Sequence, residues 1–265
     1  MFPSNWIAGA PFQLSTTANL VVYILIWVVS IAGLVFVFWR GRSSSFARWT
    51  TQDILILAIM GVLLEVYDNL IGDQFITPII SLIPFGHALA LNDLPYMFIL
   101  ITGVALIRKP GAATAMVFLN YLLMQLLYGS GINILMWPYG IWQGLFIDIY
   151  FVLRGGQVFS GKDFPAVIDG LIMGALRAFP AVTMQSAILG PYIEGSTRTL
   201  IYIVLYSLFN LIGNGVEAGI SAPFAMRIAR SVNPSAGVKQ EDQDIFTRDE
   251  SVATDVGIAT QEESV

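Results

Sequence analysis

The stretch Ile107-Arg108-Lys109-Pro110-Gly111-Ala112-Ala113 decides the fold, because it is a short basic joint between two apolar runs. Proline lacks a backbone N–H and glycine accepts a left-handed backbone, so Pro110-Gly111 ends one helix before the next begins. The runs on either side, residues 88–107 and 112–128, are close to the roughly 20 residues that cross a bilayer core. The sequence therefore predicts a hairpin of two membrane helices with a basic turn.

The rest of the chain has the composition of a membrane protein. Of its 265 residues, 56% are hydrophobic and only 12% are charged, whereas a soluble domain has about 25% charged residues. The mean hydropathy is +0.72. Further apolar runs of span length occupy residues 19–39, 53–71, 132–153, 164–189 and 199–226. Seven spans fill nearly the whole chain and leave no room for a separate soluble catalytic domain.

Basic residues set the predicted topology. The run Phe75–Gly86 is short and contains Pro78 and Pro84, so we expect a re-entrant or surface segment there rather than a span. With seven spans and an outer N-terminus, the cytoplasmic loops hold nearly all the basic residues, as the positive-inside rule requires. These residues are Arg40, Arg42, Arg48, Arg108, Lys109, Arg154, Lys162, Arg227, Arg230 and Lys239. An eighth span would move Arg108 and Lys109 outside. We therefore predict a multi-pass protein of the cell membrane with its N-terminus outside and its C-terminus inside.

Several function classes lack the residues they need. No lysine lies within a predicted span, which excludes a retinal Schiff base. The chain has no cysteine and a single histidine, His87, so we expect no metal site, and we place His87 at a pocket rim or in a loop. No Gly-x-x-x-x-Gly-Lys-Ser/Thr phosphate loop is present for ATP hydrolysis. The basic residues mark topology rather than forming a patch, so nucleic-acid binding has no support.

Three motifs carry a resemblance to a known family. They are Thr51-Gln52-Asp53-Ile54-Leu55-Ile56-Leu57-Ala58, the joint Arg108-Lys109-Pro110-Gly111-Ala112-Ala113, and Trp142-Gln143-Gly144-Leu145-Phe146-Ile147-Asp148 before Arg154. In this order they resemble the YkoE-type substrate-binding (S) components of energy-coupling factor (ECF) transporters, a branch of the ABC transporters. The resemblance covers about Thr51–Arg230. It departs from the family pattern at Asp148, where the family has Glu, and at Asn120 and Gln125, in a helix that often carries a further Glu.

The resemblance implies an all-α membrane fold with a six-helix substrate-binding domain at residues 51–232. Residues 1–50 then add an extra N-terminal transmembrane helix and a basic loop, and residues 233–265 form an acidic, disordered cytoplasmic tail. The implied function is a non-enzymatic capture subunit, without a cofactor, that binds a water-soluble vitamin, thiamine or its pyrimidine precursor, at the outer face. Its implied partners are a transmembrane coupling subunit and two cytoplasmic ATPase subunits, besides membrane lipids. The coupling contact falls on Ala58 and Gly61, small residues of the first domain helix.

Polar and aromatic side chains gather on the predicted outer halves of the spans. Burying them in hydrocarbon is costly unless they find partners, so their convergence indicates a binding pocket. A flat cationic heterocycle would suit it, because aromatic faces attract cations and carboxylates supply countercharge. The predicted substrate-binding residues are Glu65 and Asp93 as charge partners, Trp137, Tyr139 and Trp142 as stacking groups, and Asn69, Tyr96, Asn120, Gln143 and Asp148. The alternative for the aromatic residues is an interfacial belt at the span ends.

Arg177 lies near the middle of the sixth predicted span, where an isolated guanidinium would be very costly. It therefore requires an anion. We predict a structural ion pair of Arg177 with Asp148 or Glu217, and Asp169 is a further candidate. An anionic group of the ligand is the alternative partner.

Two other function classes remain open. A membrane enzyme acting on a lipid or isoprenoid substrate would need paired acidic motifs for Mg²⁺, and only Asp68 and Asp73 offer such a pair. A non-transporting membrane scaffold would instead use the acidic tail as its working part.

Overall fold

The computed structural model describes residues 2–3, 6–42, 48–129, 131–159 and 163–232. Helices make up nearly all of this part of the chain, which has no strand beyond one isolated bridge between Pro11 and Thr199. The α-helices are α1 (Thr16–Arg42), α2 (Thr51–Glu65), α3 (Thr77–Ile80), α4 (Leu94–Ile107), α5 (Ala112–Leu127), α6 (Trp137–Leu153), α7 (Asp163–Met184) and α8 (Leu200–Val232). The predicted acidic tail, residues 233–265, lies outside the described residues.

Two of these helices continue as π-helices. The π-helical segment η2 (Val66–Ile76) joins α2 to α3, and η5 (Gln185–Glu194) extends α7. Single 3₁₀ turns, η3 (Leu91–Asp93) and η4 (Ile134–Met136), precede α4 and α6. The helical period, and with it the direction in which side chains point, therefore changes along two of the long helices.

The protein is a multi-pass membrane protein by the length and hydropathy of its helices. Four continuous helices are long and apolar enough to cross a bilayer: Thr16–Arg42, Thr51–Ile80, Asp163–Glu194 and Leu200–Val232. Leu91–Ile107 and Ala112–Leu127 are shorter apolar helices. Each of the seven predicted spans coincides with a helix, but the number that cross the membrane and their orientation stay predictions.

The segment Phe75–Gly86 is not a separate helix. Residues up to Ile80 continue the helix that starts at Thr51, and turns follow from Ser81. The predicted end of that helix, at residue 71, was too early. Pro78 does not end it, although it lies inside the continuous helix; it stands where the π-helical hydrogen bonding changes to that of α3, and the helix ends two residues later.

The basic joint forms the predicted hairpin. α4 ends at Ile107, and Arg108 takes a left-handed conformation with φ 49° while its N–H bonds to the Val104 carbonyl. Gly111, with φ 86°, is the N-cap of α5. Arg108 also donates from Nη2 to the Gly156 carbonyl, 3.1 Å away, just beyond α6. The joint thus ties the turn of one hairpin to the end of the next helix.

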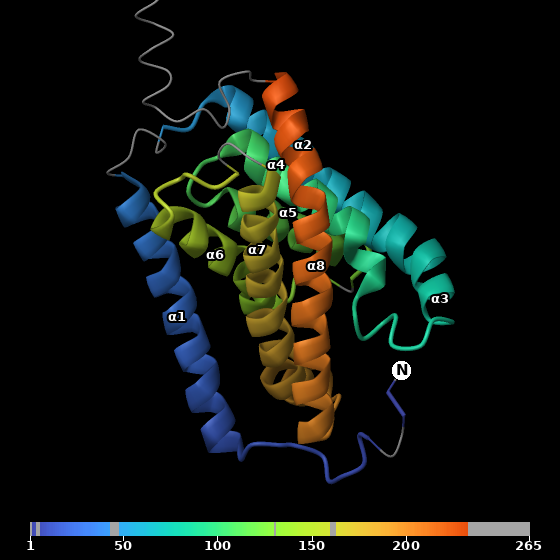
Figure 1. Cartoon of the computed structure of the whole chain (residues 1–265). Helices are drawn as coiled ribbons and strands as arrows, with labels where there is room; N and C mark the ends of the chain where they lie inside the picture. Colours follow the sequence, from blue (N-terminus) through green and yellow to red (C-terminus); the bar gives the residue numbers. More distant parts are fainter. Residues whose placement is uncertain (1, 4–5, 43–47, 130, 160–162, 233–265) are drawn as a thin grey trace, which may run out of the picture.

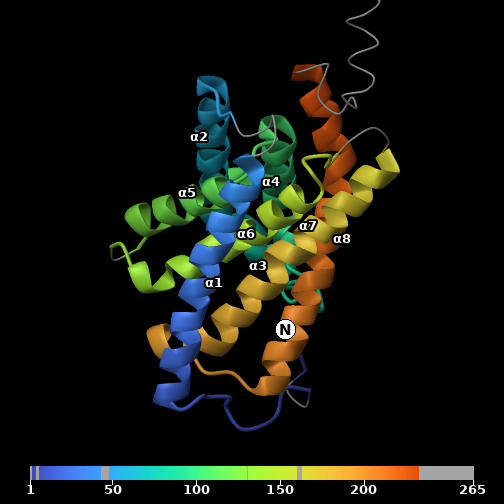
Figure 2. The same cartoon turned by 90° about the vertical axis from the view of Figure 1, so that its left-hand side faces the viewer.

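The pair α7–α8 forms the centre of the bundle (Figure 1). Added Cβ atoms at Gly170 and Gly174 would overlap the α8 backbone at Ala218 and Asn214, so the two glycines allow these helices to touch. α5 and α6 run obliquely across the bundle, and α1 stands at its edge, where it packs on α6 (Figure 2).

The residues before α1 cross one end of the bundle, from the neighbourhood of α3 past the start of α8 (Figure 1). We call the described part of them, residues 2–3 and 6–14, the N-terminal strap. The Phe12 N–H donates to the Arg198 carbonyl at 2.7 Å, and Thr199 Oγ1 donates to the Ile7 carbonyl at 3.0 Å. Phe2 is buried against Phe85 and Phe209. The strap therefore fastens the loop between α3 and α4 to the first half of α8.

Candidate substrate-binding site

A cavity of about 420 Å³ lies between η2, the α3–α4 loop and helices α4 to α8. This volume is within the range of small-molecule sites, about 300–1,000 Å³. Most of its lining is polar: Asp68, Asn69, Asp73, His87, Asn92, Asp93, Tyr96, Asn120, Tyr121, Tyr139, Gln143, Arg177, Gln185, Ser186, Tyr206 and Asn210. Asp73 and His87 are exposed and mark its mouth, whereas Asn120 and Gln143 are buried at its depth. The fold thus holds an open polar pocket inside an apolar bundle.

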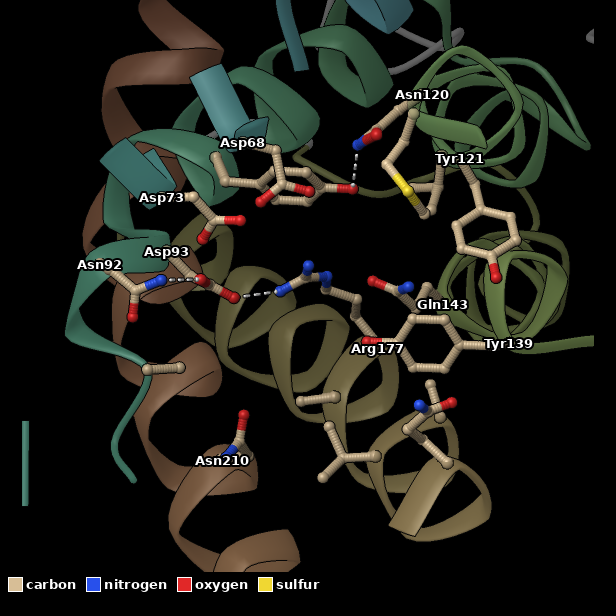
Figure 3. Close-up of a pocket in the computed structure, with 18 of the residues that line it drawn as sticks. Asp68, Asp73, Asn92, Asp93, Asn120, Tyr121, Tyr139, Gln143, Arg177 and Asn210 are labelled. Atoms are coloured by element: carbon tan, nitrogen blue, oxygen red, sulfur yellow. Dashed lines mark hydrogen bonds and ion pairs between the residues drawn. The ribbon is translucent and has the colours of Figure 1, made fainter. Parts of the chain in front are cut away.

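The π-helical segment η2 supplies two of the acids. A π-helix repeats near every fifth residue, so Asp68 and Asp73 face the same side, and Figure 3 shows both carboxylates directed into the cavity. In an α-helix, residues five apart point roughly 140° away from each other. The sequence analysis considered Asp68 and Asp73 only as the acidic pair of a membrane enzyme and left both out of the predicted substrate site, although their five-residue spacing was the available signal.

Arg177 reaches the cavity from α7 and is almost fully buried. Its Nη1 donates to Asp93 Oδ2 at 2.8 Å and to Asn214 Oδ1, and its guanidinium lies 4.2 Å from the centre of the Tyr96 ring. Arg177 forms an ion pair, but in this structure its partner is neither Asp148 nor Glu217, which the prediction named. The partner is Asp93, because η3 and the start of α4 bring this acid to the open side of Arg177 (Figure 3).

Asp148 does not line the cavity, contrary to the prediction that it binds substrate or pairs with Arg177. It is buried, and it accepts hydrogen bonds from the N–H groups of Ala113 at 3.2 Å and Thr114 at 2.7 Å, and from Thr114 Oγ1 at 2.5 Å. A carboxylate is favourable at this place because the first N–H groups of α5 have no helical partners. Asp148 therefore fastens α6 to the joint. Gly144 of α6 allows this close approach, because an added Cβ there would overlap the backbone of Thr114.

The other two candidate partners of Arg177 differ from each other. Asp169 accepts from the Tyr150 hydroxyl at 2.6 Å and from the Phe159 N–H at 3.0 Å, and it lies 3.5 Å from Arg154. Glu217 is buried on α8, and neither of its carboxylate oxygens has a hydrogen-bond partner. Asp169 is thus part of a structural network, whereas Glu217 is unpaired.

The structure brings together six of the ten predicted substrate-binding residues. Asn69, Asp93, Tyr96, Asn120, Tyr139 and Gln143 all line the cavity. Asn120 Nδ2 donates to the Tyr96 hydroxyl at 3.4 Å. This hydrogen bond links α5 to α4 at the cavity. Contact of these six residues with a ligand stays a prediction.

Three further predicted residues lie behind the cavity wall. Glu65 accepts from Asn69 Nδ2 at 2.9 Å and is otherwise buried. Trp137 packs edge-on against Phe118, and Trp142 donates from Nε1 to Ser30 Oγ of α1 at 2.8 Å. The prediction failed for these tryptophans because the extra helix α1 covers the face of α6 that carries Trp142, and α5 covers Trp137.

The predicted coupling contact is wrong for one of its two residues. Gly61 is buried, and an added Cβ would lie 2.7 Å from the side chain of Leu119 on α5. Gly61 therefore serves packing within the bundle. Ala58 is half-buried, and its contact with a partner stays a prediction.

The cavity has an excess of negative charge. Asp68, Asp73 and Asp93 stand against the single guanidinium of Arg177. Within the described parts of the chain, no three His, Asp or Glu side chains lie close enough together to hold a metal ion. The arrangement can therefore supply carboxylates and aromatic faces to an organic cation.

Comparisons with known proteins agree with this architecture. A family model described as the permease component of ABC-type cobalt transport systems matches residues 52–163. A crystal structure of an S-component of an ECF transporter is similar with a TM-score of 0.51 and 15% identity, over 78% of this chain and 98% of that chain. No curated protein matches the chain. The predicted S-component fold is thus confirmed, while the thiamine subtype is not tested by these matches.

Proposed function

We propose that the protein is the substrate-capture subunit of an ECF-type importer in the cell membrane. The observation that carries this proposal is the cavity of about 420 Å³ with three aspartates and one arginine inside a membrane bundle of S-component fold. A buried polar cavity is costly in a membrane protein that has no use for it. Binding of a polar substrate would account for the presence of this cavity.

The substrate we propose is a small heterocycle, with the cation thiamine or its pyrimidine precursor favoured. Asp68 and Asp73 supply carboxylates that Arg177 does not bind in this structure, and both face the cavity. Tyr121 and Tyr139, which pack edge to face with ring centres 5.9 Å apart, offer aromatic surface on the opposite wall (Figure 3). Such rings attract cations by roughly 0.5–2 kcal/mol. The cavity thus combines countercharge with a stacking surface.

The proposed partners are a transmembrane coupling subunit and two cytoplasmic ATPase subunits. One lipid-facing side of α2 supports a docking role, because Ile54, Leu55 and Ile59 are 58%, 61% and 50% exposed around the half-buried Ala58. The chain has no phosphate loop of its own, so the proposal assigns ATP hydrolysis to these separate subunits.

Calorimetric titration of the protein in lipid nanodiscs tests the proposal. The ligands are thiamine, hydroxymethylpyrimidine, riboflavin, biotin, cobalamin and Co²⁺. Calorimetry is preferable to tryptophan fluorescence, because none of the described tryptophans lines the cavity. We expect saturable binding of thiamine or the pyrimidine that is weakened by Asp68→Asn and unchanged in Trp142→Phe. Binding of Co²⁺ alone would replace the vitamin with a metal cargo, and no binding of any ligand would reject the proposal.

A further inference from the structure

Glu217 is a buried acid whose presence is not explained by contact with the cavity, because it is not among the lining residues. Its side chain is 4% exposed, and both carboxylate oxygens lack a hydrogen-bond donor. An unpaired carboxylate in the interior of a membrane protein is strongly unfavourable unless it gains a partner in another state. Glu217 does not line the cavity, so direct binding of the ligand does not account for it.

Its position on α8 places it beside Arg177. Glu217 follows Asn214 by three residues, so the two side chains share one face of the helix. Asn214 Oδ1 accepts a hydrogen bond from Arg177 Nη1. The acid therefore lies about one helical turn along α8 from Asn214, the α8 residue that binds the guanidinium.

Arg177 has the capacity for a second carboxylate. A guanidinium carries five N–H donors, and Arg177 uses Nη1 for Asp93 and Asn214 while its buried Nε has no partner. Asn214 also keeps a buried Nδ2 without a partner. The group formed by Arg177 and Asn214 is thus incompletely bonded, and Asn214 shares its face of α8 with Glu217.

We infer that Glu217 is the second partner of Arg177, and that Arg177 passes from Asp93 to Glu217 when a cationic ligand takes Asp93. The inference rests on the proposed function, since it needs a cation in the cavity. Asn214 holds the guanidinium throughout and serves as its pivot. After the exchange, the ligand pairs with Asp93 and Arg177 pairs with Glu217, so no charge is left alone. Glu217 thereby sets the preference for a charged over a neutral ligand without touching either.

A double-mutant cycle on the ligand-free protein tests the pairing. The thermal unfolding midpoint in detergent is measured for Asp93→Asn, Glu217→Gln and the double variant. If Glu217 accepts Arg177 when Asp93 is lost, each single variant keeps one acid and loses little, and the double variant loses more than the sum. Additive losses would overturn the pairing.

Two matched controls accompany this cycle. Glu65→Gln removes another buried acid that has one carboxylate oxygen without a partner, and Asn69 rather than Arg177 binds it. Asp68→Asn removes a cavity acid to which Arg177 is not bonded in this structure. We expect additive losses when either change is combined with Asp93→Asn. Coupling of equal size in the Glu65→Gln control would mean that any buried acid gives the effect, which would overturn the assignment to Glu217.

The ligand half of the inference is tested with two probes of different charge. Thiamine carries a fixed positive charge, and hydroxymethylpyrimidine is neutral at pH 8. We expect Glu217→Gln to weaken thiamine binding at least tenfold and pyrimidine binding less than twofold. Equal weakening of both would overturn the charge exchange. Failure of the unaltered protein to bind either would reject the cation-binding function and the exchange with it, while the ligand-free cycle would still decide whether Glu217 is a partner of Arg177.

Discussion

Asp148 at the joint and Glu217 beside the polar cavity are buried acids in opposite situations. Both oxygens of Asp148 accept hydrogen bonds from the start of α5. Behind the cavity wall, Glu217 has no hydrogen-bond partner, and Arg177 Nε and Asn214 Nδ2 are also without one. A buried polar group is normally satisfied by the fold itself, so a cluster of unsatisfied groups indicates a place prepared for something else. The joint is therefore architecture, and the unsatisfied groups beside the cavity agree with the ligand site that we propose there.

The largest expected effect is at the joint. Asp148→Ala leaves the first N–H groups of α5 and the Thr114 hydroxyl without an acceptor in a buried place. We expect a loss of about 3–5 kcal/mol of stability, as for the loss of one partner of a buried charged network. The measurement is the unfolding midpoint in detergent, with Asp163→Ala as a control, because Asp163 forms an exposed pair with Arg227. A stable Asp148→Ala variant with normal yield would remove the contrast between the two regions.

The next effect is on ligand affinity at the cavity. Asp68→Asn combined with Asp73→Asn should weaken thiamine binding about 100-fold, or about 2.7 kcal/mol, because both carboxylates of η2 lose their charge. The unfolding midpoint should stay within about 2 °C of the original, since neither acid holds two helices together. Calorimetry and thermal unfolding are measured on the same preparation. A large loss of stability with unchanged affinity would make these acids structural, like Asp148.

A smaller effect is expected at the α7–α8 contact below Arg177. Gly174→Ala forces the two helices apart at the Asn214 carbonyl, at a cost of about 1–3 kcal/mol. Because Asn214 also binds Arg177, ligand affinity should fall together with stability. Gly215→Ala is the matched control, because its Cβ would lie 3.2 Å from the nearest atom, the Leu171 carbonyl oxygen, and needs only a small adjustment. Equal effects of the two variants on unfolding and titration would speak against a link between this contact and the cavity.

The smallest expected effect is at Trp142. Trp142→Phe removes the hydrogen bond to Ser30 but keeps an aromatic ring between α6 and α1, so we expect about 1 kcal/mol of lost stability. Ligand affinity should change less than twofold. A strong loss of binding in calorimetry would restore Trp142 to the stacking role that the sequence predicted.

The features that the sequence predicts well are local ones. The joint follows from Pro110-Gly111, and the seven helices follow from apolar runs, because helix breaking and hydropathy depend on neighbouring residues. The convergence of Asp93, Tyr96, Asn120 and Tyr139 also follows, since polar groups in apolar helices must find one another.

The features that the sequence misses depend on packing between distant segments. Asp73 joins the site only because η2 is a π-helix, which no hydropathy pattern shows. Arg177 pairs with Asp93 rather than Asp148 because α8 packs against both α7 and α4 and so brings the start of α4 to Arg177. Trp142 packs against α1 and hydrogen-bonds to Ser30 instead of lining the cavity, and α1 is a helix that the resemblance to the family does not include. Each of these outcomes was decided by tertiary contacts rather than by local preference.

The N-terminal strap has a consequence for how this protein is made. Its hydrogen bonds join Ile7 to Thr199 and Leu14 to Tyr192, which are 192 and 178 residues apart. A ribosome completes these partners only after nearly all the helices have been synthesised. The strap is therefore synthesised before most of the bundle but docks among the last segments, and the loop that carries Phe85 and His87 is fastened only at that late step. The mouth of the cavity is thus completed only after the residues around Tyr192 and Thr199 have been synthesised.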